Sequence, residues 1–181
     1  GATIRRKVCG MSFTPGALPG QFRGVNPIGT FNPHIKPFAL ASASQFRAPP
    51  PPALDSVEYA ADFAEVLAIG GATSATRTAA QLEVARLHTE SPATFLPRNY
   101  RAFAMDGKAI ADNARVMAML WVTMADATTA CFETKYFYAF WRPGRAITLA
   151  DTDGNAATVQ DPAWTPSVPT PNHPEYPSAH L

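Results

Sequence analysis

One apolar segment in the second half of the chain limits the possible folds more than any other feature. From about Ile110 to Trp141 the 181-residue sequence is rich in Ala, Met and Leu, and it is hydrophobic nearly all round between Val116 and Val122. A helix with apolar residues on every side is normally covered by its neighbours, so this segment predicts the central helix of a bundle. We expect Arg142-Pro143-Gly144 to end it, because proline breaks the helical hydrogen-bond ladder.

Shorter helices are predicted before this segment. Asp55 or Ser56 can cap the first of them, and Gly70-Gly71 can end it. No segment of any length shows the alternating period of a strand, so the sequence predicts an all-α fold. The segments expected to be helical are Val57–Leu67, Thr73–His88 and Asn99–Met105, the last of which breaks at Asp106-Gly107.

Proline-rich segments flank the predicted bundle. Residues 1–52 are rich in Gly, Pro and Asn and end in the run Pro49 to Pro52, which excludes long helices there. Five phenylalanines in this segment argue against disorder. We expect residues 1–52 to form an extended arm packed on a helical-bundle domain of residues 53–181, with residues 144–181 as a long loop.

Composition excludes several classes of protein. Hydrophobic residues make up 46% and charged residues 16%, as in a globular chain, and a net charge of +1 gives no field for nucleic acid. No apolar run is long enough to span a membrane. The two cysteines are too few for a disulfide scaffold or a zinc cluster. Cys131 is expected to be a small side chain in the core, and a disulfide between Cys9 and Cys131 is the alternative.

Two cations are the first candidate site residues. Lys135 and Arg142 lie seven residues apart, which returns nearly to the same face of a continuous helix two turns later. Both could then reach one bound oxyanion, Arg through its planar fork and Lys as a point charge. The alternative is a solvated pair at the end of an amphipathic helix.

A small-residue turn with a histidine is the second candidate. In Pro177-Ser178-Ala179-His180, the small side chains would let an anion approach backbone N–H groups, and His180 could act as general acid or base. The alternative is a capping turn with a surface histidine.

Taken together, the two motifs resemble a known superfamily. Lys135-x6-Arg142-Pro143 followed by Pro177-Ser178-Ala179-His180 resembles the signature of the vanadium-dependent haloperoxidases and the type 2 phosphatidic-acid phosphatases (PAP2). The resemblance extends over roughly residue 20 onward and is similar to the soluble haloperoxidase-like branch. The further stretches that carry it are Pro37–Leu40, Pro52–Tyr59, Ser74–Thr78, Ala125–Ala127, Asp153–Asn155 and Thr170–Tyr176.

The resemblance implies a role for each motif residue toward vanadate or its isostere phosphate. Lys135 would bond the oxyanion and polarise a bound peroxide, and Arg142 would compensate negative charge. Ser178 and the backbone N–H of Ala179 would complete the cradle, and His180 would be the acid–base residue. No residue of this chain is expected to ligate a separate metal ion.

Two residues and one absent motif bear on how closely the sequence follows the family pattern. His173, seven residues before His180, occupies the position that flanks vanadate and is histidine in bromoperoxidase-like members. Ala179 replaces the usual glycine, which is a serious change where the turn needs a positive φ. The third motif of the family, Ser-Arg-x5-His-x3-Asp, is absent from these residues, so the sequence is expected to be truncated before it.

Three functions follow from the resemblance. The first is a partial vanadium haloperoxidase that oxidises halide with hydrogen peroxide when complete, and a second chain could complete the site. The second is an acid phosphatase acting on a phosphoester. The third is a non-catalytic remnant or storage or binding protein. The 181 residues alone are expected to be inactive, and an extracellular location is implied by resemblance only.

Overall fold

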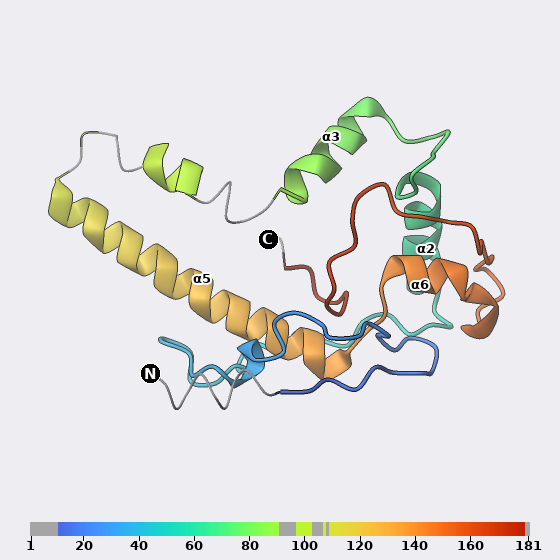
Figure 1. The fold of residues 1–181 in the computed structure, drawn as a ribbon, viewed down its shortest axis with the longest axis horizontal. Helices are drawn as coiled ribbons and strands as arrows, with labels where there is room; N and C mark the ends of the chain where they lie inside the picture. The colour runs from blue at the N-terminus through green and yellow to red at the C-terminus, as the bar shows by residue number, and fades with distance from the viewer. Residues whose placement is uncertain (1–10, 91–96, 103–106, 108, 180–181) are drawn as a thin grey trace.

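The computed structural model describes residues 11–90, 97–102, 107 and 109–179. Within this part of the chain the structure is helical and has no strand, only two isolated bridges. The predicted all-α class is therefore confirmed (Figure 1). Residues 97–102 are helical, and the named elements are η1 (Asn32–His34), α2 (Val57–Ile69), α3 (Ala79–His88), α5 (Ile110–Tyr138), α6 (Pro143–Thr148) and η2 (Ala150–Thr152). None of the described helices combines the length and apolarity needed to cross a membrane.

The two shorter helices begin at side-chain caps. Ser56 caps α2 by accepting the N–H of Tyr59 at 3.1 Å, as the sequence predicted. The start predicted for the next helix at Thr73 is wrong, because α3 begins after Thr78, which forms a capping box with Gln81. The preceding residues form a turn instead, in which the Ser74 hydroxyl accepts backbone N–H groups.

The long helix ends earlier than the sequence predicted. α5 stops at Tyr138, because Ala139 adopts the left-handed conformation (φ 44°, ψ 47°) while its N–H still bonds the Lys135 carbonyl at 2.8 Å. Pro143 does not end a helix but begins α6, a position where proline loses no helical hydrogen bond. The expectation of an unbroken loop over residues 144–181 is therefore wrong as well, since α6 and η2 occupy its first part.

The apolar core lies where α2 meets α6, away from the first half of α5. It is built from Tyr59, Phe63, Trp141 and Ile147, with Ala146 and Ala150. α5 reaches away from this core (Figure 1).

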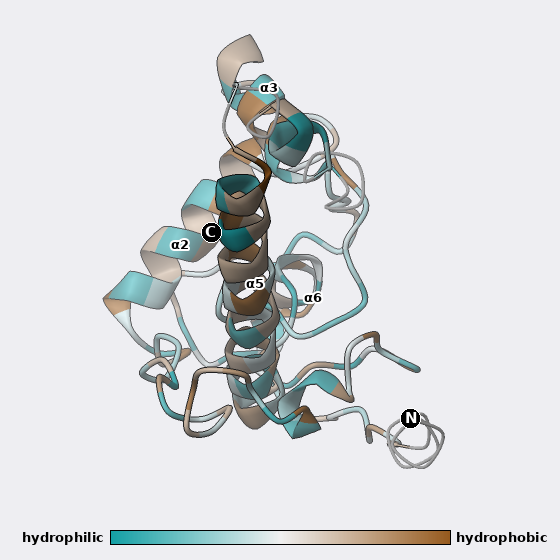
Figure 2. Ribbon diagram, turned by 90° about the vertical axis from the view of Figure 1, so that its left-hand side faces the viewer, coloured by the Kyte–Doolittle hydropathy of each residue, from teal (hydrophilic) through white to brown (hydrophobic). Residues whose placement is uncertain are grey.

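α5 is not the central helix of a bundle along its full length. Apolar residues follow much of it (Figure 2), yet Ile110 is 90% exposed and Trp121 51%. Its buried residues, Asp126, Thr129, Thr134 and Lys135, are polar and lie in its second half. The apolar pattern correctly predicted a helix, but it does not specify which segments cover that helix.

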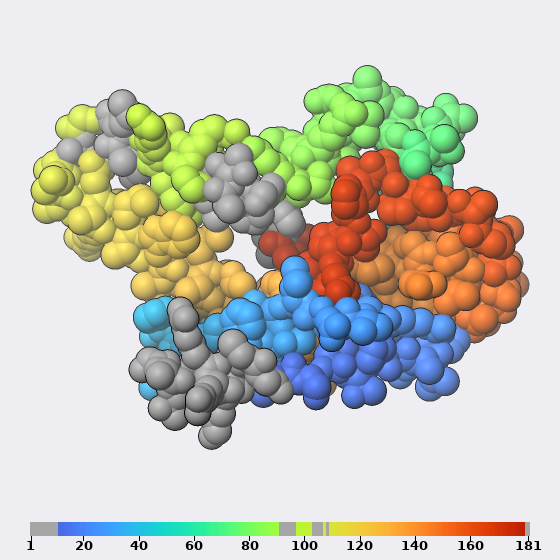
Figure 3. All heavy atoms as spheres, viewed as in Figure 1, coloured from blue at the N-terminus to red at the C-terminus, as the bar shows by residue number. Residues whose placement is uncertain are grey.

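The N-terminal segment lies along the second half of α5, beside the segment that follows η2. Figure 3 shows the N-terminal segment, in blue, beside both. η1 contacts α5, and Asn172 donates to the carbonyls of Val25 and Asn26. Asp126 provides a further attachment, because its carboxylate accepts the N–H groups of residues 38–40 at 2.7, 2.7 and 3.0 Å. Burial acts to raise the pKa of Asp126, but these three bonds outweigh it and hold the pKa below its usual value.

Candidate oxyanion site

Lys135 lies in the last turn of α5 and is almost fully buried, with 1% of its surface exposed. Its ammonium donates to the carbonyls of Pro174 at 3.0 Å, Glu175 at 2.7 Å and Pro177. Burial lowers the pKa of Lys135 to about 8, which still leaves it charged at neutral pH. An ammonium has three donors, so the three carbonyls use all of them. In this structure Lys135 therefore fastens the 173–177 segment to α5.

Arg142 holds the same segment from the other end. It is the N-cap residue of α6, and its guanidinium donates from Nε to the His173 carbonyl at 2.5 Å. Its Nη1 pairs with the Glu175 carboxylate at 2.6 Å, and its Nη2 lies 2.8 Å from Nδ1 of His173. The two predicted cations therefore converge on residues 173–177.

This convergence does not arise in the way the sequence suggested. The argument from a shared helix face is wrong, because α5 ends at Tyr138 and Arg142 belongs to the next helix. Ala139 turns the chain, and Phe140 then bridges to Gln21 of the N-terminal segment. The cations meet because both bond the 173–177 segment.

His173 is a buried, neutral side chain. Burial, aided by the positive charges of Arg142 and Lys135, lowers the pKa of His173 to about 4. Its Nδ1 lies 2.8 Å from Nη2 of Arg142, which can only donate, and 3.0 Å from the Pro174 carbonyl, which can only accept, so the two contacts favour opposite tautomers of the ring. The Phe132 ring packs against it at a centroid distance of 5.3 Å.

The small-residue turn follows directly after this segment. Ser178 and Ala179 are exposed, and the thiol of Cys131 lies 3.5 Å from the Ser178 carbonyl. Cys131 is a free cysteine whose pKa is raised by burial. His180 and Cys9 lie outside the described residues. The structure thus brings Lys135, Arg142 and His173 together beside the start of the turn.

Glu175 is the site residue that the sequence analysis did not single out. Its carboxylate pairs with Arg142, and its carbonyl accepts from Lys135. The signal was present, since Glu175 is an acidic residue in the stretch Thr170–Tyr176, which also contains the predicted ligand His173. The carboxylate of Glu175 supplies to Arg142 the negative charge that a bound oxyanion would otherwise supply.

The donor set fits a tetrahedral oxyanion in its chemistry. An ammonium, a guanidinium and a turn of small residues are the groups that recognise such anions. In this structure, however, the Lys135 and Arg142 donors bond groups of the 173–177 segment. An oxyanion would have to exchange places with some of those partners.

Comparison with known proteins gives two matches. Residues 115–181 match the family model described as the VCPO second helical-bundle domain. The chain is also similar to a solved structure described as the first bacterial vanadium-dependent iodoperoxidase, with a TM-score of 0.60 and 24% sequence identity. That alignment covers 98% of this chain and 44% of the other. No curated protein matches the chain.

Residues 115–181 are thus similar to a domain of the vanadium haloperoxidase family, in agreement with the predicted resemblance, and the structural match shows that the fold is shared. The family-model match covers Lys135, Arg142 and the Pro177–Ala179 turn, and the structural match extends the shared fold to nearly all of the chain. The chain spans less than half of the length of the iodoperoxidase chain. At 24% identity, the similarity between the two shows a shared fold.

Proposed function

We propose that this chain contributes part of a vanadate site in a protein that oxidises halide with hydrogen peroxide. The observation that carries the proposal is the convergence of Lys135 and Arg142 on the segment that leads into Ser178 and Ala179. Vanadate, when bound, supplies a Lewis-acidic centre that activates peroxide.

Each residue has a distinct part in this proposal. Arg142 and Lys135 neutralise the negative charge of the oxyanion, Arg142 through its planar fork. Ser178 and the N–H of Ala179 donate to the oxyanion from the turn. His173 stays neutral and orients Arg142 through its ring nitrogen. His180, outside the described residues, is proposed as the acid–base residue on the resemblance alone.

Binding of the oxyanion by the chain is the direct test. We expect vanadate added to the protein to give a bound signal in vanadium-51 NMR, and phosphate to displace it because the two ions are isosteric. Replacing Arg142 with Ala should weaken binding by at least about tenfold, since a charge-assisted bond contributes roughly 1.5–3 kcal/mol. Arg145→Ala, which removes an exposed charge from the same helix α6, is the matched control.

Two outcomes bear on the proposal in opposite ways. Loss of vanadate binding in Arg142→Ala but not in Arg145→Ala would support it. Binding that is equally unaffected in both variants would show that the role given to Arg142 is wrong.

Activity assays test the finer part of the proposal. Because the third motif is absent from these 181 residues, we expect no turnover of iodide or bromide with hydrogen peroxide by this chain alone. Hydrolysis of an aryl phosphate, with no halide oxidation, would instead favour the phosphatase function of the same superfamily.

A further inference from the structure

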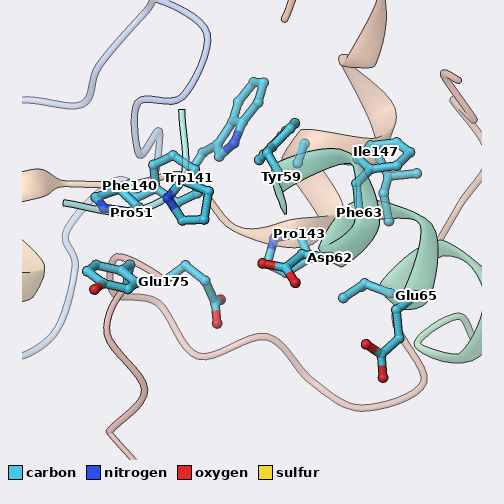
Figure 4. A pocket seen from close by; sticks show the side chains of 14 residues that line it. Pro51, Tyr59, Asp62, Phe63, Glu65, Phe140, Trp141, Pro143, Ile147 and Glu175 are labelled. Carbon is cyan, nitrogen blue, oxygen red and sulfur yellow. The ribbon is translucent and has the colours of Figure 1, made fainter. Parts of the chain in front are cut away.

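An aromatic pocket lies beside the oxyanion site and shares Glu175 with it. It has a volume of about 310 Å³ and forms where α2, α6 and residues 140–141 meet Pro51, Pro52 and residues 175–176 (Figure 4). The rings of Tyr59, Phe63, Phe140 and Trp141 line it, and its exposed lining is mainly apolar. A pocket of this size and character suits a small organic molecule.

Two buried polar groups in the lining have no regular hydrogen-bond partner in the described part of the chain. The Tyr59 hydroxyl and the Trp141 indole N–H belong to side chains that are 5% and 1% exposed. Burial, the largest effect, raises the pKa of Tyr59, and a hydrogen bond from the indole of Trp141 to the Tyr59 hydroxyl acts in the opposite direction. A hydroxyl oxygen has two lone pairs, so that of Tyr59 can still accept a hydrogen bond from an ammonium in the pocket.

The mouth of the pocket is negatively charged. Asp62 and Glu65 are exposed on α2, and neither forms an ion pair or hydrogen bond in the described structure. Glu175 also lines the pocket, but its charge is balanced by Arg142. No Lys, Arg or His is among the lining residues. Figure 4 shows the carboxylates of Asp62, Glu65 and Glu175 on one side and the rings of Tyr59 and Trp141 on the other.

We propose that this pocket binds a small organic ammonium ion with a compact aromatic or branched apolar body. The apolar body would lie against the four rings, where removing its surface from water is favourable. The ammonium would face the two unpaired carboxylates and could also contact the electron-rich face of a ring. An anionic ligand would meet the repulsion of the same carboxylates. This charge preference is opposite to that of the oxyanion site, so the proposal is independent of the proposed function.

Three probes of similar size and different charge provide the test. Phenethylammonium, 2-phenylethanol and phenylacetate share an aromatic body and carry charges of plus one, zero and minus one. We expect phenethylammonium to shift the Trp141 indole N–H signal in NMR titrations and to saturate. We expect 2-phenylethanol to bind at least about threefold more weakly and phenylacetate not to bind.

Variants of α2 separate the pocket from general charge effects. The double variant D62N/E65Q should weaken phenethylammonium binding by about three- to tenfold and leave 2-phenylethanol unaffected. Glu58→Gln removes a charge from the same helix without touching the pocket, and it should change neither affinity. Because all three positions are exposed, the variants should fold, which thermal unfolding checks.

Several results would overturn the proposal. Equal affinities for the ammonium and the alcohol would show that the pocket has no preference for a positive charge. If no probe gives a saturable shift of the Trp141 signal, the pocket does not bind a ligand of this kind. An effect of Glu58→Gln as large as that of D62N/E65Q would mean that only the net charge matters. These outcomes do not depend on vanadate binding, so they are distinct from failure of the proposed function.

Discussion

At the scale of single residues, the segment from His173 to Pro177 accounts for most of what Lys135 and Arg142 do. Lys135 bonds three backbone carbonyls of this segment, and Arg142 bonds one carbonyl, the imidazole ring of His173 and one carboxylate. Of these partners only the Glu175 carboxylate carries a full negative charge. Glu175 is therefore the group that most resembles the proposed oxyanion and competes with it directly.

Replacing Glu175 with Gln is expected to strengthen oxyanion binding. The substitution removes the charge opposite Arg142 while keeping the size of the side chain, so phosphate or vanadate affinity should rise by about three- to tenfold. Isothermal titration calorimetry measures this, with Glu83→Gln as an exposed control. If the wild-type protein binds the oxyanion and Glu175→Gln binds it with the same affinity, Glu175 does not compete with the oxyanion. If neither protein binds, the oxyanion site itself is refuted.

His173 makes stability depend on pH in a defined window. Its folded pKa of about 4 lies below the ordinary value of 6.5, so between these values the unfolded chain binds a proton that the folded chain does not. The stability that the neutral ring provides is complete above pH 6.5 and falls as the pH drops toward 4, by at most about 3 kcal/mol.

Urea unfolding at pH 7, 5.5 and 4.5 measures this dependence. His173→Gln should show a flatter profile than the wild type over that window. His34→Gln, a change at an exposed histidine, should keep the wild-type slope. If the slope of His173→Gln matches the wild type, the neutral buried histidine is not the cause.

At the scale of elements, the end of α5 decides how the site is assembled. Had the helix continued to Trp141, Arg142 would have projected from the same rigid rod as Lys135. Instead, Ala139 stops the helix in the left-handed conformation, the chain turns through Phe140 and Trp141, and α6 begins at Pro143. Trp141 is thereby placed in the core and Arg142 at the edge of the site.

Substitution of alanine by glycine should change the stability of the fold in opposite directions at Ala139 and at Ala118. The left-handed conformation of Ala139 costs roughly 1–2 kcal/mol because of its Cβ, and glycine avoids that cost. Glycine also makes the unfolded chain more flexible, which offsets part of the gain in stability. Ala139→Gly should therefore stabilise the fold by about 0.5 kcal/mol. Ala118→Gly, at an exposed position inside α5, should destabilise it by about 1 kcal/mol. Chemical denaturation measures both, and destabilisation by both variants would contradict the conformation of Ala139.

At the scale of the whole molecule, an irregular N-terminal segment is held on α5 by polar contacts more than by apolar packing. Phe22 is buried, but Phe31, Phe38 and Phe46 are exposed. Asp126 is buried and accepts three consecutive backbone N–H groups from residues 38–40. Tyr138 adds a bond from its hydroxyl to the Ala48 carbonyl at 3.0 Å. Removing the Asp126 charge should therefore loosen the segment.

Hydrogen exchange detects that loosening. In Asp126→Asn, the amides of Phe38, Ala39 and Leu40 should exchange faster by at least about tenfold, because an amide oxygen is a weaker acceptor than a carboxylate. Asp112→Asn removes an exposed carboxylate from the same helix and should leave these amides unchanged. Unchanged exchange in Asp126→Asn would mean that the carboxylate does not hold the segment.

Local sequence determined the helices and the chemistry of the site. Helical period and capping residues act over a few neighbours, so the all-α class, the start of α2 and the existence of α5 could be predicted. The two motifs likewise indicated the superfamily, because they specify which donors are present, and the family-model match over residues 115–181 supports that resemblance.

Only the tertiary structure decided how those pieces meet. The left-handed Ala139, the role of Glu175 as partner of Arg142 and the attachment of residues 38–40 to Asp126 each depend on residues far apart in sequence. The exposure of the first half of α5 has the same origin, because an apolar pattern records that a surface favours burial and not which segment covers it. Such contacts arise from the balance of burial, charge and hydrogen bonding across the whole chain.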